Sequence, residues 1–124
     1  MPHEGLLAKL RGYGFHGKLM KILEALYQCP RASVRVGSHR SDPFDYMIGV
    51  RQGCPASPIL FNLYINDVLD GLSGVRVGDM TIPGLLFADD AVVLAESSQA
   101  LQEDLVRIIK WCRQLKISLN ISSI

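Results

Sequence analysis

The sequence predicts an α+β fold in which antiparallel strands pack against helices, and three observations support this. Segments whose apolar residues recur at helical spacing are interspersed with short segments of strand character. Turn sequences join several of the strand-like segments, so these should pair as antiparallel hairpins. The length of 124 residues, 48% of them hydrophobic, fits one domain or part of one with a true core.

The first third of the chain predicts two helices and a hairpin. Residues 4–28 have apolar residues at helical spacing on both sides of Gly12-Tyr13-Gly14, so two helices with a glycine-containing joint are expected. Cys29-Pro30 should end the second helix, because the residue before a proline disfavours the helical region. Residues 33–49 alternate around a turn-like stretch and predict a β-hairpin.

The middle of the chain predicts a loop that leads into a buried helix. Residues 49–72 begin with a stretch rich in glycine and proline. Ser57-Pro58 resembles an N-cap followed by proline at the first helical position. The helix that follows is apolar on several faces, so it should be deeply buried and continue to Leu72.

The last third predicts hairpins and an amphipathic helix. Residues 75–95 contain Gly78-Asp79, a tight-turn sequence, and Asp89-Asp90 between two apolar runs. A helix should cover residues 98–116, beginning after Ser97 or Ser98. Leu119 and Ile121 suggest a last short strand.

Charge and composition narrow the function classes. No run approaches the ~18 apolar residues of a membrane-spanning helix, and no secretory signal is recognisable, so an intracellular protein of the nucleus or cytoplasm is expected. Three scattered cysteines indicate reduced thiols rather than a zinc site or disulfides. Residues 1–51 have a charge of +4 and residues 52–109 have −6, so one part could contact phosphates and the other could bind cations.

Asp89-Asp90 is the sharpest local feature. Two ionised carboxylates so close together repel each other unless a cation lies nearby. Mg²⁺ is the natural candidate, because it prefers oxygen ligands and typically uses one or two carboxylates together with substrate phosphates. Aspartates also favour ordinary turns, so this pair alone leaves both readings open.

The loop before the buried helix offers a second candidate site. Arg51 and Gln52 supply hydrogen-bond donors for phosphate or base, and Gly53 lets the backbone approach a ligand closely. The loop enters a helix N-terminus, where free N–H groups favour anions. A rigid structural loop is the alternative reading of the same residues.

Together these two strings resemble the reverse transcriptase family. Gly49–Leu69 resembles the motif that these enzymes place between fingers and palm, and Leu85–Asp90 resembles their Phe-Ala-Asp-Asp signature in the form found in non-LTR retrotransposons. The two strings follow in the family's order, with 31 residues from Gly53 to Gly84. The segments Pro2–Phe15, Val34–Val50 and Lys116–Asn120 agree in order and spacing, so the resemblance covers nearly the whole chain.

The resemblance implies an RNA-directed DNA polymerase palm that binds an RNA or DNA template–primer. Asp89 and Asp90 would be catalytic and would bind Mg²⁺, with Asp89 facing the metal more directly. Arg51, Gln52 and Gly53 would lie against nucleotide and template, and Phe87 under the primer end. The expected fold is a palm-like antiparallel sheet packed against helices, incomplete, as a partial reverse transcriptase domain over residues 1–124.

The chain departs from the family pattern at its ends. The family uses a further aspartate on a strand before the first helix, and fingertip strands and a thumb; none of these is recognised here, so the chain is expected not to polymerise by itself. An open sheet edge would favour a homodimer, or a partner chain that supplies a strand. The alternative function is a non-catalytic module that retained the palm fold and binds nucleic acid or protein, for example through Lys18, Arg31, Arg35 and Arg40.

Overall fold

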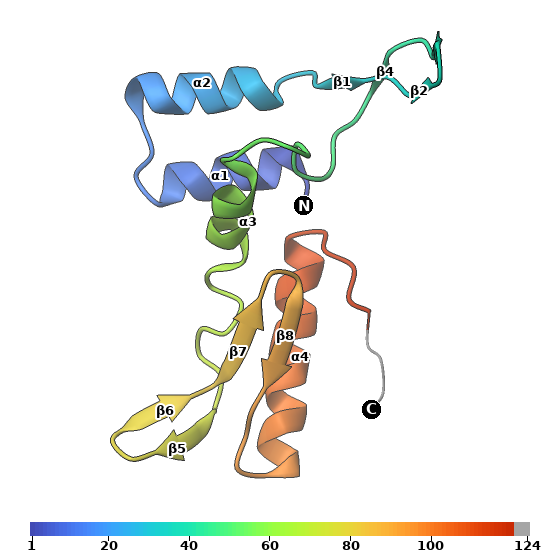
Figure 1. Ribbon diagram of the computed structural model, residues 1–124. Helices are drawn as coiled ribbons and strands as arrows, with labels where there is room; N and C mark the ends of the chain where they lie inside the picture. Colours follow the sequence, from blue (N-terminus) through green and yellow to red (C-terminus); the bar gives the residue numbers. More distant parts are fainter. Residues whose placement is uncertain (121–124) are drawn as a thin grey trace.

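The computed structural model describes residues 1–120 and shows two regions joined through a helix (Figure 1). The first region contains α1 (His3–Gly12), α2 (Gly17–Tyr27) and α3 (Ser57–Ile65), with a strand-containing arm that extends from the end of α2. The second contains two β-hairpins and the long helix α4 (Ser98–Gln114), which lies along one of them. The predicted α+β class is confirmed.

The hydrophobic core lies among the first three helices. Helix α1 packs against both α2 and α3, and the buried side chains interdigitate at this junction. Leucines three and four apart on the helices supply most of it, as helical periodicity requires. The core consists of Leu6, Leu10, Met20, Leu23, Tyr27, Leu60 and Tyr64.

The arm is a hairpin built of two short ladders. β1 (Arg31–Ala32) pairs with β4 (Phe44–Asp45), and farther out β2 (Arg35–Val36) pairs with β3 (His39–Arg40). Gly37-Ser38 forms the tip, so the turn is shorter than the predicted stretch 37–43. The arm projects away from the helices, and most of its side chains are exposed (Figure 1).

Helix α3 is shorter and less buried than the sequence suggests. It ends at Ile65 rather than Leu72, and the chain continues in tight turns, with Val68 N–H donating to the Ile65 carbonyl at 3.0 Å. Only Ser57, Leu60 and Tyr64 are buried, and Ile59 is 63% exposed. The helices α1 and α2 cover one side of α3, so its other apolar side chains remain in contact with solvent.

The second region consists of hairpins and α4. β5 (Val75–Val77) pairs with β6 (Met80–Ile82) around the Gly78-Asp79 turn, and β7 (Gly84–Phe87) pairs with β8 (Asp90–Val93). A parallel bridge between Gly74 and Ala95 connects the two hairpins. Within residues 1–120 the strands therefore form four two-stranded ladders rather than one continuous sheet.

Helix α4 begins at a side-chain cap and covers β8. Ser97 Oγ accepts a hydrogen bond from Ala100 N–H at 3.1 Å, which satisfies one of the free donors of the first turn. The inward face contains Asp104, Ile108 and Cys112, all buried. Leu119 lies in no strand, and Ile121, the other residue of the suggested last strand, lies outside the described residues.

None of the helices within residues 1–120 is both long and apolar enough to cross a membrane. The cysteines are all free thiols, with Cys29 exposed, Cys54 half-buried and Cys112 buried. The scattered cysteines of the sequence are therefore not paired in disulfides.

A candidate carboxylate hairpin and a candidate nucleotide loop

The two candidate aspartates lie at the tip of the β7–β8 hairpin. Phe87 pairs with Asp90, so Ala88-Asp89 is the two-residue turn and Asp90 is the first residue of β8. Ala88 has a φ of 53°, in the left-handed region. A residue with a Cβ pays about 1–2 kcal/mol for this conformation. Backbone strain of this kind often marks functional sites, so the turn is a candidate on structural grounds as well.

Gly84 determines how closely the two strands of this hairpin approach. A Cβ at this position would lie 2.3 Å from the carbonyl oxygen of Val92, a distance that no side chain tolerates. Only glycine therefore permits the observed ladder, in which Leu85 pairs with Val92 and Phe87 with Asp90. The position of Asp90 relative to Asp89 depends on this register.

Both carboxylates are free to bind a cation. Asp89 and Asp90 are exposed, and within residues 1–120 neither takes part in an ion pair or a side-chain hydrogen bond. Carboxylate oxygens are suitable ligands for Mg²⁺, which usually takes only one or two from the protein. The same part of the chain contains no cluster of three or more metal-ligating side chains. The hairpin thus fits a metal that obtains its remaining ligands elsewhere.

The candidate nucleotide loop is held on the N-terminus of α3. The Arg51 carbonyl accepts hydrogen bonds from Cys54 N–H at 3.3 Å and from Ser57 Oγ at 2.7 Å. Gly53 has a φ of 76° with open space around it, so its backbone conformation rather than crowding favours glycine here. Arg51 and Gln52 are exposed, and their side chains are available to a ligand.

A buried histidine attaches this loop to the beginning of the chain. His3 is 2% exposed, and its Nε2 donates to the Gly49 carbonyl at 3.0 Å. The ring lies 4.8 Å from that of Tyr27 and 5.6 Å from that of Tyr46. Burial lowers the pKa of His3, because a charged imidazolium would lose its hydration there. The neutral ring therefore holds Gly49, the first residue of the loop.

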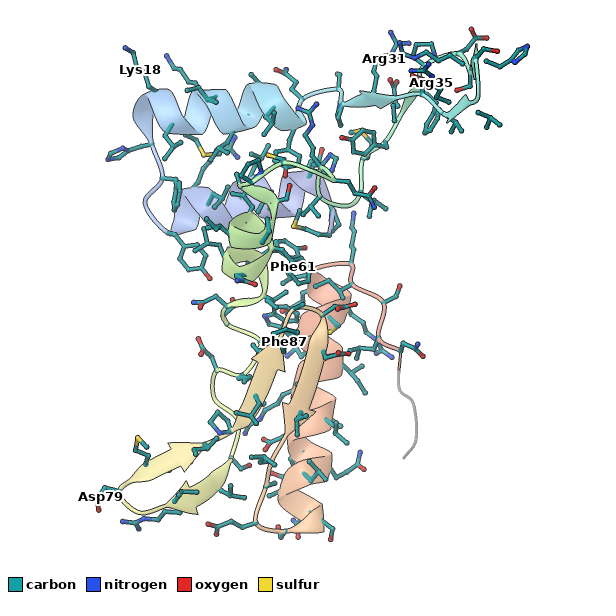
Figure 2. All side chains as sticks on the ribbon, viewed as in Figure 1. Lys18, Arg31, Arg35, Phe61, Asp79 and Phe87 are labelled. Atoms are coloured by element: carbon teal, nitrogen blue, oxygen red, sulfur yellow. The ribbon has the colours of Figure 1, made fainter. Side chains whose placement is uncertain are left out.

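The structure does not bring the predicted residues into one pocket. The loop lies at the N-terminal end of α3, whereas the β7–β8 tip lies toward its other end (Figure 1). Among the described residues, no hydrogen bond or ion pair joins the two sites. Figure 2 shows Phe87 at the tip of β7, below Phe61 of α3, and Phe87 is 83% exposed. Loop and hairpin are two separate elements in this chain.

The basic residues also separate. Arg31 and Arg35 lie on the arm, while Lys18 lies at the opposite end of α2 (Figure 2). Arg31 is paired with Asp45 at 3.3 Å. A nucleic-acid surface that uses all of the predicted basic residues at once is therefore not formed.

The residues that connect the two regions were not found from the sequence. Lys9 of α1 forms an ion pair with Asp67, and its Nζ donates to the Tyr64 carbonyl at 2.6 Å. Trp111 of α4 donates from Nε1 to Asp67 at 3.1 Å, and its ring lies 4.9 Å from Lys9 Nζ. Tyr64 OH donates to the Leu115 carbonyl at 2.8 Å. We call Lys9, Tyr64, Asp67 and Trp111 the junction cluster.

A second unpredicted contact fixes the chain between α3 and β5. Asp104 of α4 is completely buried, and both of its carboxylate oxygens accept from Ser73 N–H, at 3.1 and 3.0 Å. Arg107 donates to the Gly71 carbonyl one turn farther along the helix. These partners are 31 and 36 residues apart in sequence, so no local pattern could reveal them.

Comparison with known proteins was made against this geometry. The family model described as Reverse transcriptase (RNA-dependent DNA polymerase) matches residues 1–122. The chain is 31% identical over 123 residues, 97% of its length, to the Retrovirus-related Pol polyprotein from type-2 retrotransposable element R2DM of Drosophila melanogaster. It is 49% identical over 111 residues, 87% of its length, to the Pol polyprotein from the type-1 element R2 of Nasonia vitripennis.

A more distant relative comes from another class of element. The chain is 27% identical over 126 aligned residues, 95% of its length, to the RNA-directed DNA polymerase from mobile element jockey of Drosophila funebris. The matched part is small in each relative. The chain spans 12% of the Drosophila melanogaster polyprotein, 11% of the Nasonia vitripennis one and 13% of the jockey polymerase.

Proposed function

Because the chain belongs to the reverse transcriptase family, we propose that it forms part of the palm of a retroelement RNA-directed DNA polymerase and presents Asp89 and Asp90 to the reaction. The observation that supports this most directly is the hairpin tip. Two exposed carboxylates without protein partners follow a strained alanine, at the position of the family's Phe-Ala-Asp-Asp motif. A purely structural turn has no need of this strain or of two adjacent negative charges.

The proposed roles follow from the chemistry of each side chain. Asp89 and Asp90 would offer carboxylate oxygens to divalent metal, on which the family depends in general. Such metal ions, when bound, stabilise the attacking and leaving oxygens of an in-line displacement at phosphorus. Arg51 and Gln52 would donate to the incoming nucleotide or template, while Gly53 allows its backbone to approach. Phe87, exposed at the same tip, would support the primer end.

We propose further that these 124 residues do not extend a primer without a partner. The described residues offer one pair of carboxylates, and the loop and the hairpin do not converge on a common pocket. Strands β7 and β8 pair only with each other, and Leu85 and Val92 on one face of that hairpin are 63% and 53% exposed. A second copy or another chain that adds a strand would cover this apolar face and supply further ligands.

Metal binding can be tested independently of catalysis. Mn²⁺ added to the ¹⁵N-labelled chain should broaden the amide signals of residues 86–92 selectively. Asp89→Asn and Asp90→Asn should weaken this broadening. Asp79→Asn is a matched control, because Asp79 is an exposed aspartate in the two-residue turn of the neighbouring hairpin (Figure 2). Equal broadening at both turns, or none at residues 86–92, would contradict the proposed metal site.

Activity is tested by primer extension on an RNA template with Mg²⁺ or Mn²⁺, with Asp89→Ala in parallel. We expect no extension by either protein. Extension by the wild-type chain that vanishes in Asp89→Ala would show that Asp89 is catalytic and that these residues find the remaining ligands, probably by association, without a foreign partner. Extension that persists in the variant would contradict the role of Asp89.

A non-catalytic module that forms a homodimer is the second candidate function. The observation in its favour is the exposed apolar face of β7–β8, which contacts no other described strand. Sedimentation equilibrium over a wide concentration range tests it, with Leu85→Thr as a variant that should weaken self-association. A wild-type chain that stays monomeric at high concentration would exclude the homodimer.

A further inference from the structure

The tip of the arm contains an open hollow that is lined only by arginine and serine. Ser33, Arg35, Ser38 and Arg40 surround a volume of about 470 Å³. Arg35 and Arg40 are opposite each other in the β2–β3 ladder, so their side chains leave the same face of the hairpin. No acidic side chain contributes to the lining. The hollow therefore concentrates positive charge and hydroxyl groups in one place.

The geometry of the two arginines leaves their outer nitrogens available. Arg40 Nε donates to Ser33 Oγ at 2.8 Å, and Arg35 Nε donates to the Gly37 carbonyl at 3.1 Å. These bonds orient both guanidinium groups but leave the Nη atoms without a protein acceptor among residues 1–120. A guanidinium fork of this kind matches the oxygens of a phosphate group.

The arginine pair is unfavourable in the free protein. Like charges directly opposite each other in a ladder repel and destabilise it. Arg31, at the base of the same arm, is paired with Asp45, and Arg11 is paired with Glu24. Neither Arg35 nor Arg40 forms an ion pair within the described residues. A bound anion would convert the repulsion into two attractive contacts.

We propose that the arm binds a phosphodiester of a nucleic-acid strand in this hollow, through Arg35 and Arg40, with Ser38 as an additional donor. The contact is to the backbone, so it should depend on salt and not on base sequence. The inference rests on the proposed function only for the presence of a strand. The hollow lies on the projecting arm, away from the Asp89-Asp90 hairpin, so the two sites can be tested separately (Figure 1).

The test measures fluorescence anisotropy of a labelled single-stranded RNA, in a buffer with a metal chelator, across a range of salt concentrations. The double variant Arg35→Gln/Arg40→Gln is compared with the wild-type chain. The control is Lys18→Gln/Lys21→Gln, which removes the same charge from exposed positions of α2, with Lys18 at the end far from the arm (Figure 2). Thermal unfolding establishes that all three proteins fold.

The expected result is a loss of affinity of roughly tenfold or more at 50 mM salt in the arginine variant, with a smaller salt dependence. Each lost phosphate contact lowers the slope of log K against log[salt] by about 0.7 for a single strand, so a change of about 1.4 is predicted. The control should retain the wild-type slope within about 0.3. Equal losses in both variants, or no RNA binding by the wild-type chain, would overturn the proposal.

Two further arms separate the possible sources of the phosphate and the two proposals. Inorganic phosphate at the concentration of RNA phosphates should not displace the strand, since a small anion makes a single contact; displacement would mean a site for free phosphate and would overturn the strand assignment. Asp89→Asn should leave RNA affinity in the chelator unchanged. Failure of Mn²⁺ binding at residues 86–92 would therefore remove the proposed metal site without changing the outcome for the arm.

Discussion

The junction cluster should determine how firmly the two regions of the chain are connected. Asp67→Asn removes the negative charge but keeps an oxygen that can accept from Trp111 Nε1. Lys9 would then retain only the Tyr64 carbonyl and the two aromatic rings, at 5.4 Å from Tyr64 and 4.9 Å from Trp111. The variant therefore isolates the contribution of the ion pair from that of the tryptophan hydrogen bond.

The magnitude follows from the exposure of the two side chains. Removing one partner of a fully buried ion pair costs about 3–5 kcal/mol, and a surface pair contributes about 0–1 kcal/mol. The Lys9 side chain is 14% exposed and that of Asp67 is 39% exposed, so the pair lies between these limits. We expect Asp67→Asn to lower the free energy of unfolding by about 2 kcal/mol.

Urea unfolding followed by Trp111 fluorescence measures this directly, because Trp111 is the only tryptophan of the chain and belongs to the cluster. Asp70→Asn is the matched control, an exposed aspartate three residues along the chain. The Lys9→Met variant completes a double-mutant cycle, for which a coupling energy of about 1–2 kcal/mol is expected. A coupling energy near zero, or equal effects of the two aspartate substitutions, would refute the assigned role of the ion pair.

Three further predictions concern other contacts. Asp104→Ala should lower the free energy of unfolding by roughly 2–3 kcal/mol because Ser73 N–H loses its buried acceptor, while Asp104→Asn, which keeps an acceptor, should have a smaller effect; equal effects in urea titrations would contradict this. Ala88→Gly should raise the free energy of unfolding by roughly 0.5–1 kcal/mol by relieving the left-handed backbone, and a lower value in the same titration would refute the strain. His3 has a lowered pKa when folded, so its contribution to stability is present above the ordinary value of 6.5 and is lost as the pH falls through the folded pKa; thermal unfolding from pH 7.5 to 5 should show this slope, and His3→Asn should reduce it.

Much of the local structure was predictable because it depends on neighbours in sequence. The joint between α1 and α2, the Gly78-Asp79 turn and the Ser97 cap each result from a few adjacent residues. Helix α3 was predicted too long, because its apolar pattern continues to Leu72. Tight turns follow Ile65 instead, in a segment where Asp67 contacts Lys9 and Trp111. A periodic pattern does not contain such distant partners.

The candidate site shows the same division. The residue types of Asp89-Asp90 and of the Arg51–Gly53 loop identified both elements from the sequence, and the family assignment is confirmed by the match over residues 1–122. Their roles remain predictions. The strain at Ala88, which sequence reasoning did not find, becomes visible only in the backbone angles.

By itself the sequence determined the family, the α+β class and the two strings where chemistry is expected, because these depend on residue identity and spacing. Tertiary structure alone decided that loop and hairpin lie apart, that Arg35 and Arg40 share one hollow, and that Lys9 meets Asp67 across 58 residues of chain. The physical reason is that burial, ion pairing and desolvation depend on distances in space. Those distances are fixed only when helices and hairpins pack together.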